Sequence, residues 1–211
     1  MPFNVALLGD SIFDNASYTR GEPDVVTHLR GLLPRDWQAS LLALDGCVSA
    51  DLGEQLPRVS HDVTHLVISV GGNDALMYSD LLNRPVLSTG DALRLFRERV
   101  ERFEADYRAA IGGALALGRP TTICTVYNGN LPASQAPNAR IALAMFNDVI
   151  LRVAFEHHLP AIELRLICNE PADYANPIEP SGRGGLKIAQ AIARSLGISM
   201  DKIEASRVYA G

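Results

Sequence analysis

Apolar runs of strand length alternate with longer segments of helical period along this 211-residue chain. Residues 5–8, 39–44, 66–70 and 121–126 are mostly apolar or β-branched, with little of the polar alternation expected of a half-exposed strand. A similar run at residues 161–167 predicts the last strand. Strands that alternate with helices predict a three-layer α/β/α sandwich around a central parallel sheet, joined by right-handed crossovers.

Amphipathic segments fill the gaps between these runs and predict the covering helices. We expect helices at residues 25–33, 49–56, 91–117, 138–157 and 181–196. Pro23 and Pro34 are placed to begin and end the first helix, and Thr89 is a candidate cap for the long one. Ser181 is the expected cap of the final helix, with Gly197 just past its end.

Composition and charge narrow the class of protein. The chain is 47% hydrophobic and 20% charged, as in soluble globular proteins, and residues 1–211 contain no linker or repeat, so we expect one domain. The net charge of −5 gives no reason to expect nucleic acid or an anionic membrane as a partner. The three cysteines have no metal-ligand spacing, and with no signal-like or membrane-spanning segment we expect free thiols and a cytoplasmic protein. We expect no cofactor, and the oligomeric state stays open.

Polar or flexible residues follow three of the predicted strands, where a parallel sheet would bring them together. Ser11 follows the first strand, Gly46 the second and Asn73 the third. Ligands of open α/β sheets bind at this carboxyl edge. A serine that attacks an ester needs donors aimed at the developing oxyanion. The backbone N–H groups of Ser11 and Gly46 and the Asn73 amide are candidates, and a side chain at position 46 would obstruct the approach of the backbone.

Each of these residues can also be explained as part of a turn with no catalytic role, because glycine, serine, aspartate and asparagine are all common in turns. Taken singly, Ser11, Gly46 and Asn73 are more simply strand terminators than catalytic groups. Their occurrence at three successive strand ends favours a functional site.

The segments Gly9-Asp10-Ser11-Ile12, Gly46 and Gly71-Gly72-Asn73-Asp74 resemble, in order, the first three blocks of the SGNH (GDSL-type) hydrolase family. Residues 176–181 stand where that family has its last block. The resemblance implies a flavodoxin-like fold, esterase or lipase chemistry on a small-molecule acyl ester, Ser11 as nucleophile, and an oxyanion hole formed by Ser11, Gly46 and Asn73.

The last block departs from the family pattern of Asp-x-x-His. Asn176 stands in place of the aspartate and Glu179 in place of the histidine. A solvated glutamate, with a pKa of about 4.3, is a poorer base than histidine, and burial raises that pKa toward working pH. We therefore expect Glu179 to act as the base, with the Asn176 amide holding its carboxylate. Asp173 or a histidine from elsewhere in the chain are the alternatives.

The positions of the histidines argue against that last alternative. His28 lies within a predicted surface helix. The other four precede predicted strands, at the end of the sheet opposite the expected site (His61, His65, His157 and His158). Loop residues after the third and fourth strands are expected to line the pocket (Met77, Tyr78, Tyr127, Asn128 and Asn130).

Two functions therefore stay open. The first is a serine esterase with a modified triad, which we favour because donors at Gly46 and Asn73 have little use without an oxyanion. The second is a degenerate hydrolase that binds a small ligand with little or no turnover. Neither the acyl chain length nor the type of ester follows from the sequence.

Overall fold

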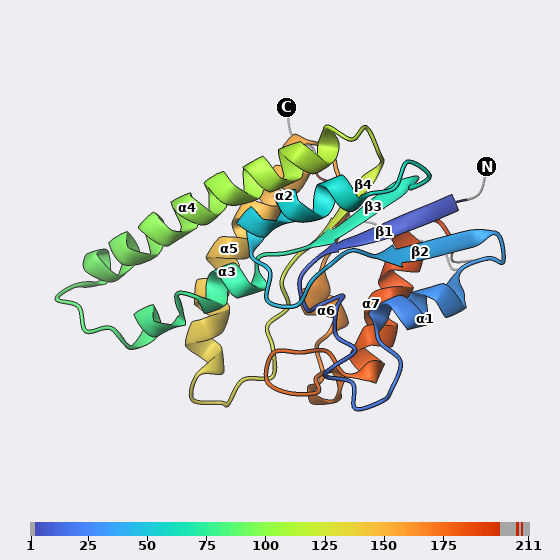
Figure 1. The fold of residues 1–211 in the computed structure, drawn as a ribbon. Helices are drawn as coiled ribbons and strands as arrows, with labels where there is room; N and C mark the ends of the chain where they lie inside the picture. Colours follow the sequence, from blue (N-terminus) through green and yellow to red (C-terminus); the bar gives the residue numbers. More distant parts are fainter. Residues whose placement is uncertain (1–2, 199–205, 207, 209–211) are drawn as a thin grey trace.

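A computed structural model of the chain, which describes residues 3–198, 206 and 208, contains the expected parallel sheet. Five strands lie in the order β2-β1-β3-β4-β5, all parallel (Figure 1). They are β1 (Phe3–Gly9), β2 (Trp37–Leu41), β3 (His65–Ser69), β4 (Thr121–Cys124) and β5 (Ala161–Ile162). The predicted three-layer α/β/α sandwich is confirmed.

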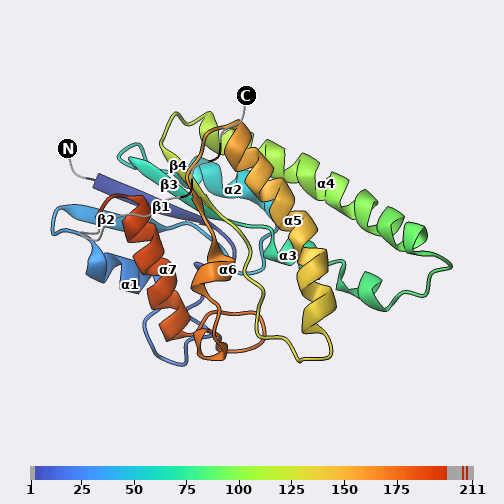
Figure 2. The ribbon, with the colours of Figure 1, turned by 180° about the vertical axis from the view of Figure 1, so that it is seen from behind.

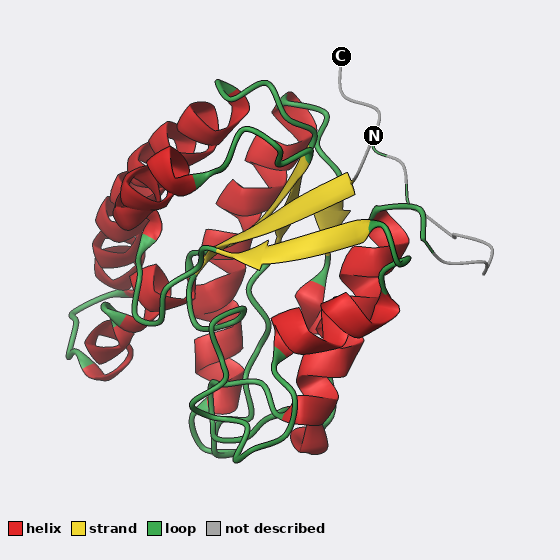
Figure 3. Ribbon diagram, turned by 45° about the vertical axis from the view of Figure 1, so that its right-hand side comes forward, coloured by secondary structure: helices red, strands yellow, loops and turns green. Residues whose placement is uncertain are grey.

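Helices cover both faces of the sheet (Figures 1 and 2). One face carries α1 (Val25–Leu32) and α7 (Gly182–Ser195), with the short α6 (Leu164–Ile167) beside α7. The other face carries α2 (Leu52–Gln55), α4 (Thr89–Leu115) and α5 (Ala136–Glu156). In Figure 3 the strands run across the view, with helices on either side of the sheet.

The first strand shows why its sequence lacks polar alternation. Val5 and Leu7 pack into the core on the side of α1 and α7, whereas Ala6 and Leu8 pack into the core on the side of α4 and α5. All four side chains are fully buried. A strand covered on both faces has no solvent side and therefore needs no polar positions.

The predicted last strand is largely wrong, because only Ala161–Ile162 pair in the sheet and Leu164–Ile167 form α6. The Glu163 side chain accepts a hydrogen bond from the Arg165 N–H, and the Leu164 N–H donates to Thr125 Oγ1. These bonds turn the chain into a helical turn directly after two paired residues.

Element boundaries differ from the predictions in a few places. The caps of α1 and α4 are Asp24 and Ser88, one residue away from Pro23 and Thr89. Strand β2 ends at Leu41, because the next two N–H groups both donate to the carbonyl of Leu7. The Ser181 cap is confirmed by its bond from the Gly184 N–H. Gly197, just past the helix, has the positive φ of +75° expected there.

Short helical segments that the sequence did not predict follow β3. They are α3 (Gly72–Leu76) and a 3₁₀ turn at Ser79–Asn83. Strand order reverses between β1 and β3, and such a switch point is where open α/β sheets bind ligands. The loops that leave β1 and β3 therefore frame the expected site. Within the described part of the chain, no helix is both long and apolar enough to cross a membrane.

Candidate active site

The end of β1 is held in one geometry by its neighbours. Gly9 has a φ of +128°, and a Cβ there would lie 1.8 Å from the carbonyl oxygen of Ser69 on β3, so only glycine fits. The side-chain amide of Gln55 pairs with both the N–H and the C=O of Gly9, at 2.8 Å each. The Asp10 N–H then donates to the carbonyl oxygen of Ser69 at 3.1 Å. Ser11 therefore follows a rigid strand end.

Asp10 forms the turn that presents Ser11. Its Oδ1 accepts from the Ile12 N–H at 3.1 Å, and its carbonyl oxygen accepts from the N–H groups of Phe13 and Asp14. Asp10 is 1% exposed and Ser11 is 7% exposed, and both line the same cavity. The serine hydroxyl is thus accessible from the cavity and shielded from bulk solvent.

The loops after β2 and β3 are joined to each other beside this turn. Asn73 Nδ2 donates to the carbonyl oxygen of Cys47 at 2.9 Å, which leaves its second amide hydrogen for another acceptor. Asp74 accepts from both the N–H and the hydroxyl of Ser49. No backbone carbonyl among the described residues accepts from the N–H of Ser11 or of Gly46. These three donors are those expected for an oxyanion hole.

Gly46 occupies a backbone conformation that favours glycine. A Cβ on Gly46 would meet no atom of the described chain within 4 Å, so packing does not demand glycine there. Its φ of +82° is the constraint, because other residues rarely adopt that conformation. Gly46 does not line the cavity itself. Its neighbour Cys47 accepts a hydrogen bond from Asn73, and Asn73 lines the cavity.

Glu179 lies within hydrogen-bonding distance of the serine. Ser11 Oγ donates to Glu179 Oε1 at 3.1 Å, across 168 residues of sequence. Glu179 is only 6% exposed. Its second oxygen, Oε2, is buried without a hydrogen-bond partner in the described structure. The two residues that the sequence singled out as nucleophile and base are therefore brought together.

The expected role of Asn176 is wrong. Its Oδ1 accepts from the N–H groups of Ile178 and Glu179, at 2.9 Å and 2.8 Å. Asn176 therefore shapes the turn that presents Glu179. It does so by accepting hydrogen bonds at its side-chain carbonyl oxygen, not by donating from its amide N–H. The loop from Tyr127 to Asn130 fixes the same turn from the other side, because the Tyr127 hydroxyl donates to the carbonyl of Ile178 at 2.6 Å.

Neither alternative base is near the serine. Asp173 is fully buried outside the cavity, where its Oδ2 accepts from the N–H groups of Asn169 and Glu170 and from Lys187 Nζ at 2.8 Å. The Arg183 guanidinium lies 3.4 Å from its other oxygen. All five histidines are among the described residues, and none of them lines the cavity.

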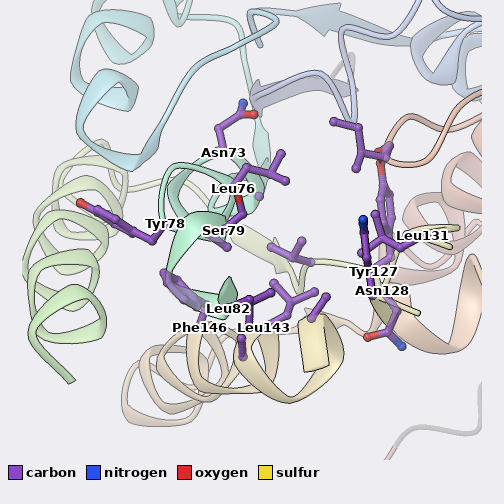
Figure 4. A pocket seen from close by; sticks show the side chains of 18 of the residues that line it. Asn73, Leu76, Tyr78, Ser79, Leu82, Tyr127, Asn128, Leu131, Leu143 and Phe146 are labelled. Carbon is purple, nitrogen blue, oxygen red and sulfur yellow. Dashed lines mark hydrogen bonds between the residues drawn. The ribbon is translucent and has the colours of Figure 1, made fainter. Parts of the chain in front are cut away.

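A cavity of about 510 Å³ opens in front of Ser11 (Figure 4). Tyr78, Tyr127 and Asn128 line it as expected, whereas Met77 and Asn130 do not. Much of the cavity wall is apolar and is formed by helical segments (Leu76, Leu82, Phe96, Leu143 and Phe146). The sequence did not predict this part of the wall. An apolar residue on a helix is by pattern indistinguishable from core, so the sequence carries no signal for a pocket role there.

Burial dominates the electrostatics of the site. It raises the pKa of Asp10 to about 8, with the nearby Glu179 and Asp74 carboxyls adding to the effect. It also raises the pKa of Glu179 above its usual value, although the hydrogen bond from Ser11 acts in the opposite direction. Burial raises the pKa of Asp74 likewise. A glutamate with a raised pKa is better matched to proton transfer near neutral pH than a solvated one.

Comparisons with known proteins agree with this fold. Residues 7–184 match the model of the GDSL-like lipase/acylhydrolase family. Comparison with curated proteins gave no significant match. Two solved structures are similar over nearly their whole length. An acetylxylan esterase from Geobacillus stearothermophilus is 20% identical, with a TM-score of 0.69, covering 95% of this chain and 97% of its own. An extracellular lipase from Streptomyces rimosus is 14% identical, with a TM-score of 0.67, covering 92% and 100%.

A structure from Veillonella parvula, described as a member of the lipolytic G-D-S-L family, is also similar, at 16% identity and a TM-score of 0.68, covering 91% of this chain and 97% of its own. The fold and the strand-end site define a parallel-sheet α/β/α protein of the SGNH type. The family match spans most of the chain, and this protein belongs to the GDSL-like lipase/acylhydrolase family.

Proposed function

We propose that this protein hydrolyses carboxylic esters, with Ser11 as the nucleophile and Glu179 as its general base. The observation that carries the proposal is the 3.1 Å hydrogen bond from Ser11 Oγ to Glu179 Oε1, between two buried side chains in one cavity. Family membership and the esterase and lipase descriptions of similar structures support ester hydrolysis.

In the proposed acylation step, Ser11 Oγ attacks the ester carbonyl as its proton passes to Glu179 Oε1. The N–H groups of Ser11 and Gly46 and the free amide hydrogen of Asn73 stabilise the oxyanion. The C–O bond to the alcohol then breaks, and the proton moves from Glu179 to the departing oxygen. The products are a free alcohol and an acyl group on Ser11.

A carboxylate base changes the charge balance of this step. When neutral histidine takes the serine proton, a cation and an oxyanion are created together. When Glu179 takes it, one negative charge moves from the carboxylate to the oxyanion. A protonated glutamate is neutral, whereas a protonated histidine is a cation. Glu179 therefore does not need an acidic residue at position 176 to balance its charge. Asn176 as a turn-forming neutral residue is consistent with this arrangement.

Deacylation needs the same base to remove a proton from water. Glu179 Oε2 is buried, lacks a partner in the described structure, and belongs to a residue that lines the cavity. A buried acceptor of this kind gains free energy by binding a donor such as water. Attack of that water on the acyl carbon releases the carboxylic acid, and the proton returns through Glu179 to Ser11 Oγ.

A degenerate, ligand-binding protein is the second candidate. The observation that favours it is the lack of a polar group behind Glu179, since Oε2 has no partner among the described residues. A carboxylate that nothing orients loses part of the advantage of proximity.

Labelling with a fluorophosphonate probe separates the two functions, because only an activated serine reacts. We expect a covalent adduct on the peptide that contains Ser11, no adduct in Ser11→Ala, and unchanged labelling in Ser79→Ala, a second serine of the cavity wall. Hydrolysis of p-nitrophenyl acetate by the parent and not by Ser11→Ala completes the test. A folded parent that neither labels nor hydrolyses any ester overturns the proposed function.

A further inference from the structure

The cavity has two walls of different character (Figure 4). One wall is formed by α3, the 3₁₀ turn at Ser79–Asn83 and α5, and it presents apolar side chains (Leu76, Leu82, Leu143 and Phe146). The other wall is the loop after β4, where Tyr127, Asn128 and Leu131 lie on the side of the Glu179 turn. Ser11 lines the same cavity.

The direction of the reaction assigns each wall to one half of the substrate. Glu179 must deliver its proton to the leaving oxygen, so the alcohol half lies on the side of Glu179 and the loop after β4. The carbonyl oxygen points toward Asn73 and the backbone donors. The acyl chain is then directed along the remaining wall, toward Leu82 and Leu143.

Charge further restricts what this cavity accepts. Asp10, Asp80 and Glu179 line it, and no lysine, arginine or histidine of the described residues does. The Arg99 guanidinium lies over the Tyr78 ring, 5.0 Å from its centroid, and is not part of the wall. An anionic group in the cavity would be desolvated beside carboxylates with no cation to compensate it.

We propose that the substrate is an uncharged ester whose acyl chain is apolar and of medium length, seated against Leu76, Leu82, Leu143 and Phe146. The proposal rests on the proposed function and names the substrate class of the same site. An acetyl group leaves most of the 510 Å³ cavity unfilled, whereas a longer apolar chain such as hexanoyl has room to bury its methylene groups against the apolar wall. Each methylene buried there should raise kcat/KM roughly threefold to fourfold.

The first experiment measures kcat/KM for p-nitrophenyl acetate, butyrate and hexanoate, and for the p-nitrophenyl monoester of adipic acid. Adipate has the length of hexanoate and carries a carboxylate at its far end. We expect kcat/KM to rise about a hundredfold from acetate to hexanoate, and to be at least a hundredfold lower for the adipate monoester than for hexanoate. Ethyl and hexyl acetate, which vary the alcohol half, should differ by less than about fivefold.

Two variants test the assigned wall from opposite sides. Leu143→Trp on α5 and Leu82→Trp on the facing 3₁₀ turn each fill the proposed acyl site, so the ratio of hexanoate to acetate kcat/KM should fall at least tenfold. Ile141→Trp is the matched control, because Ile141 is 70% exposed on the same helix as Leu143 and outside the cavity. The ratio of hexanoate to acetate kcat/KM in Ile141→Trp should equal that of the parent.

The outcomes separate this proposal from the proposed function. Equal or faster hydrolysis of acetate than of hexanoate, with Ser11 still labelled by fluorophosphonate, overturns the acyl assignment and leaves the esterase intact. A chain-length effect confined to the alcohol half, or an adipate monoester as good as hexanoate, also overturns it. Absence of both labelling and hydrolysis overturns the proposed function and this proposal with it.

Discussion

Two carboxylates in one loop, Asp173 and Glu179, are equally buried and differently surrounded. Asp173, fully buried, receives two backbone N–H bonds and the Lys187 ammonium, with Arg183 nearby. Glu179, 6% exposed, receives one bond from the Ser11 hydroxyl. Each carboxylate has one buried oxygen without a hydrogen-bond partner in the described structure, but that of Asp173 lies 3.4 Å from the Arg183 guanidinium. One carboxylate is compensated by cations and the other is not.

The difference distinguishes a structural carboxylate from the carboxylate that we propose as general base. The cations and N–H donors around Asp173 offset the cost of burying its carboxylate and tie it to α7. An uncompensated buried carboxylate destabilises the fold and has a raised pKa, which is what a general base needs. Locally destabilising features, such as a buried carboxylate without a cation, are expected at functional sites.

The largest expected effect comes from removing the carboxylate of the proposed base. Glu179→Gln keeps the size and reach of the side chain but accepts no proton, so kcat/KM for esters should fall by about a thousandfold. The free energy of unfolding at pH 8 should stay equal or increase, because a buried charge without a cation is removed. Glu170→Gln, in the same loop and outside the cavity, is the control. Parent-like hydrolysis by Glu179→Gln would show that the base lies elsewhere.

The reverse result is expected for the structural carboxylate. Asp173→Asn leaves Lys187 and Arg183 without their buried partner, and we expect a loss of about 2 kcal/mol in the free energy of unfolding in urea. This is below the 3–5 kcal/mol typical of a broken buried pair, because both cations reach solvent. The kcat/KM of the folded protein should fall less than tenfold. A loss of activity without a loss of stability would assign Asp173 to the catalytic apparatus.

A smaller effect is expected at the turn between the two carboxylates. Asn176→Ala removes the acceptor for the N–H groups of Ile178 and Glu179, which should cost about 1 kcal/mol of stability and lower kcat roughly tenfold, because Glu179 is less well positioned. Asn176→Asp keeps the acceptor oxygen and should restore kcat. Failure of Asp to restore it would mean that the amide nitrogen matters, as the sequence suggested.

Sequence patterns predicted the sheet and most helices. The pairing of Ser11 with Glu179 was predicted from the resemblance of residues 9–12 and 176–181 to the first and last blocks of the SGNH family. Sequence reasoning failed where a single side chain redirects the backbone, as Glu163 does after β5 and Asn176 does before Glu179. It also missed the apolar wall around Leu143, since residues on a helix give the same pattern whether they face a core or a cavity. The surroundings of Asp173 and Glu179 differ through contacts that no local pattern encodes.

The smallest and most diagnostic effect is the pH dependence of stability. Burial raises the pKa of Glu179 above its ordinary value of 4.5, so the folded state binds this proton more tightly than the unfolded state. That contribution to stability is fully present below pH 4.5 and is lost as pH rises through the raised pKa. Activity runs the opposite way, because only the ionised carboxylate accepts the serine proton.

Kinetics and urea unfolding from pH 4 to pH 9 should therefore show kcat/KM rising over a range in which stability falls. Asp10, with a pKa raised to about 8, prolongs the fall in stability toward that pH without contributing a base. Glu179→Gln should remove the lower part of the stability slope, and Asp10→Asn the upper part. Asp173→Asn should lower stability over the neutral range and leave the rise of kcat/KM with pH in place. If Glu179→Gln leaves the slope unchanged, Glu179 is ionised in the folded state as readily as in the unfolded chain, and the contrast with Asp173 is lost.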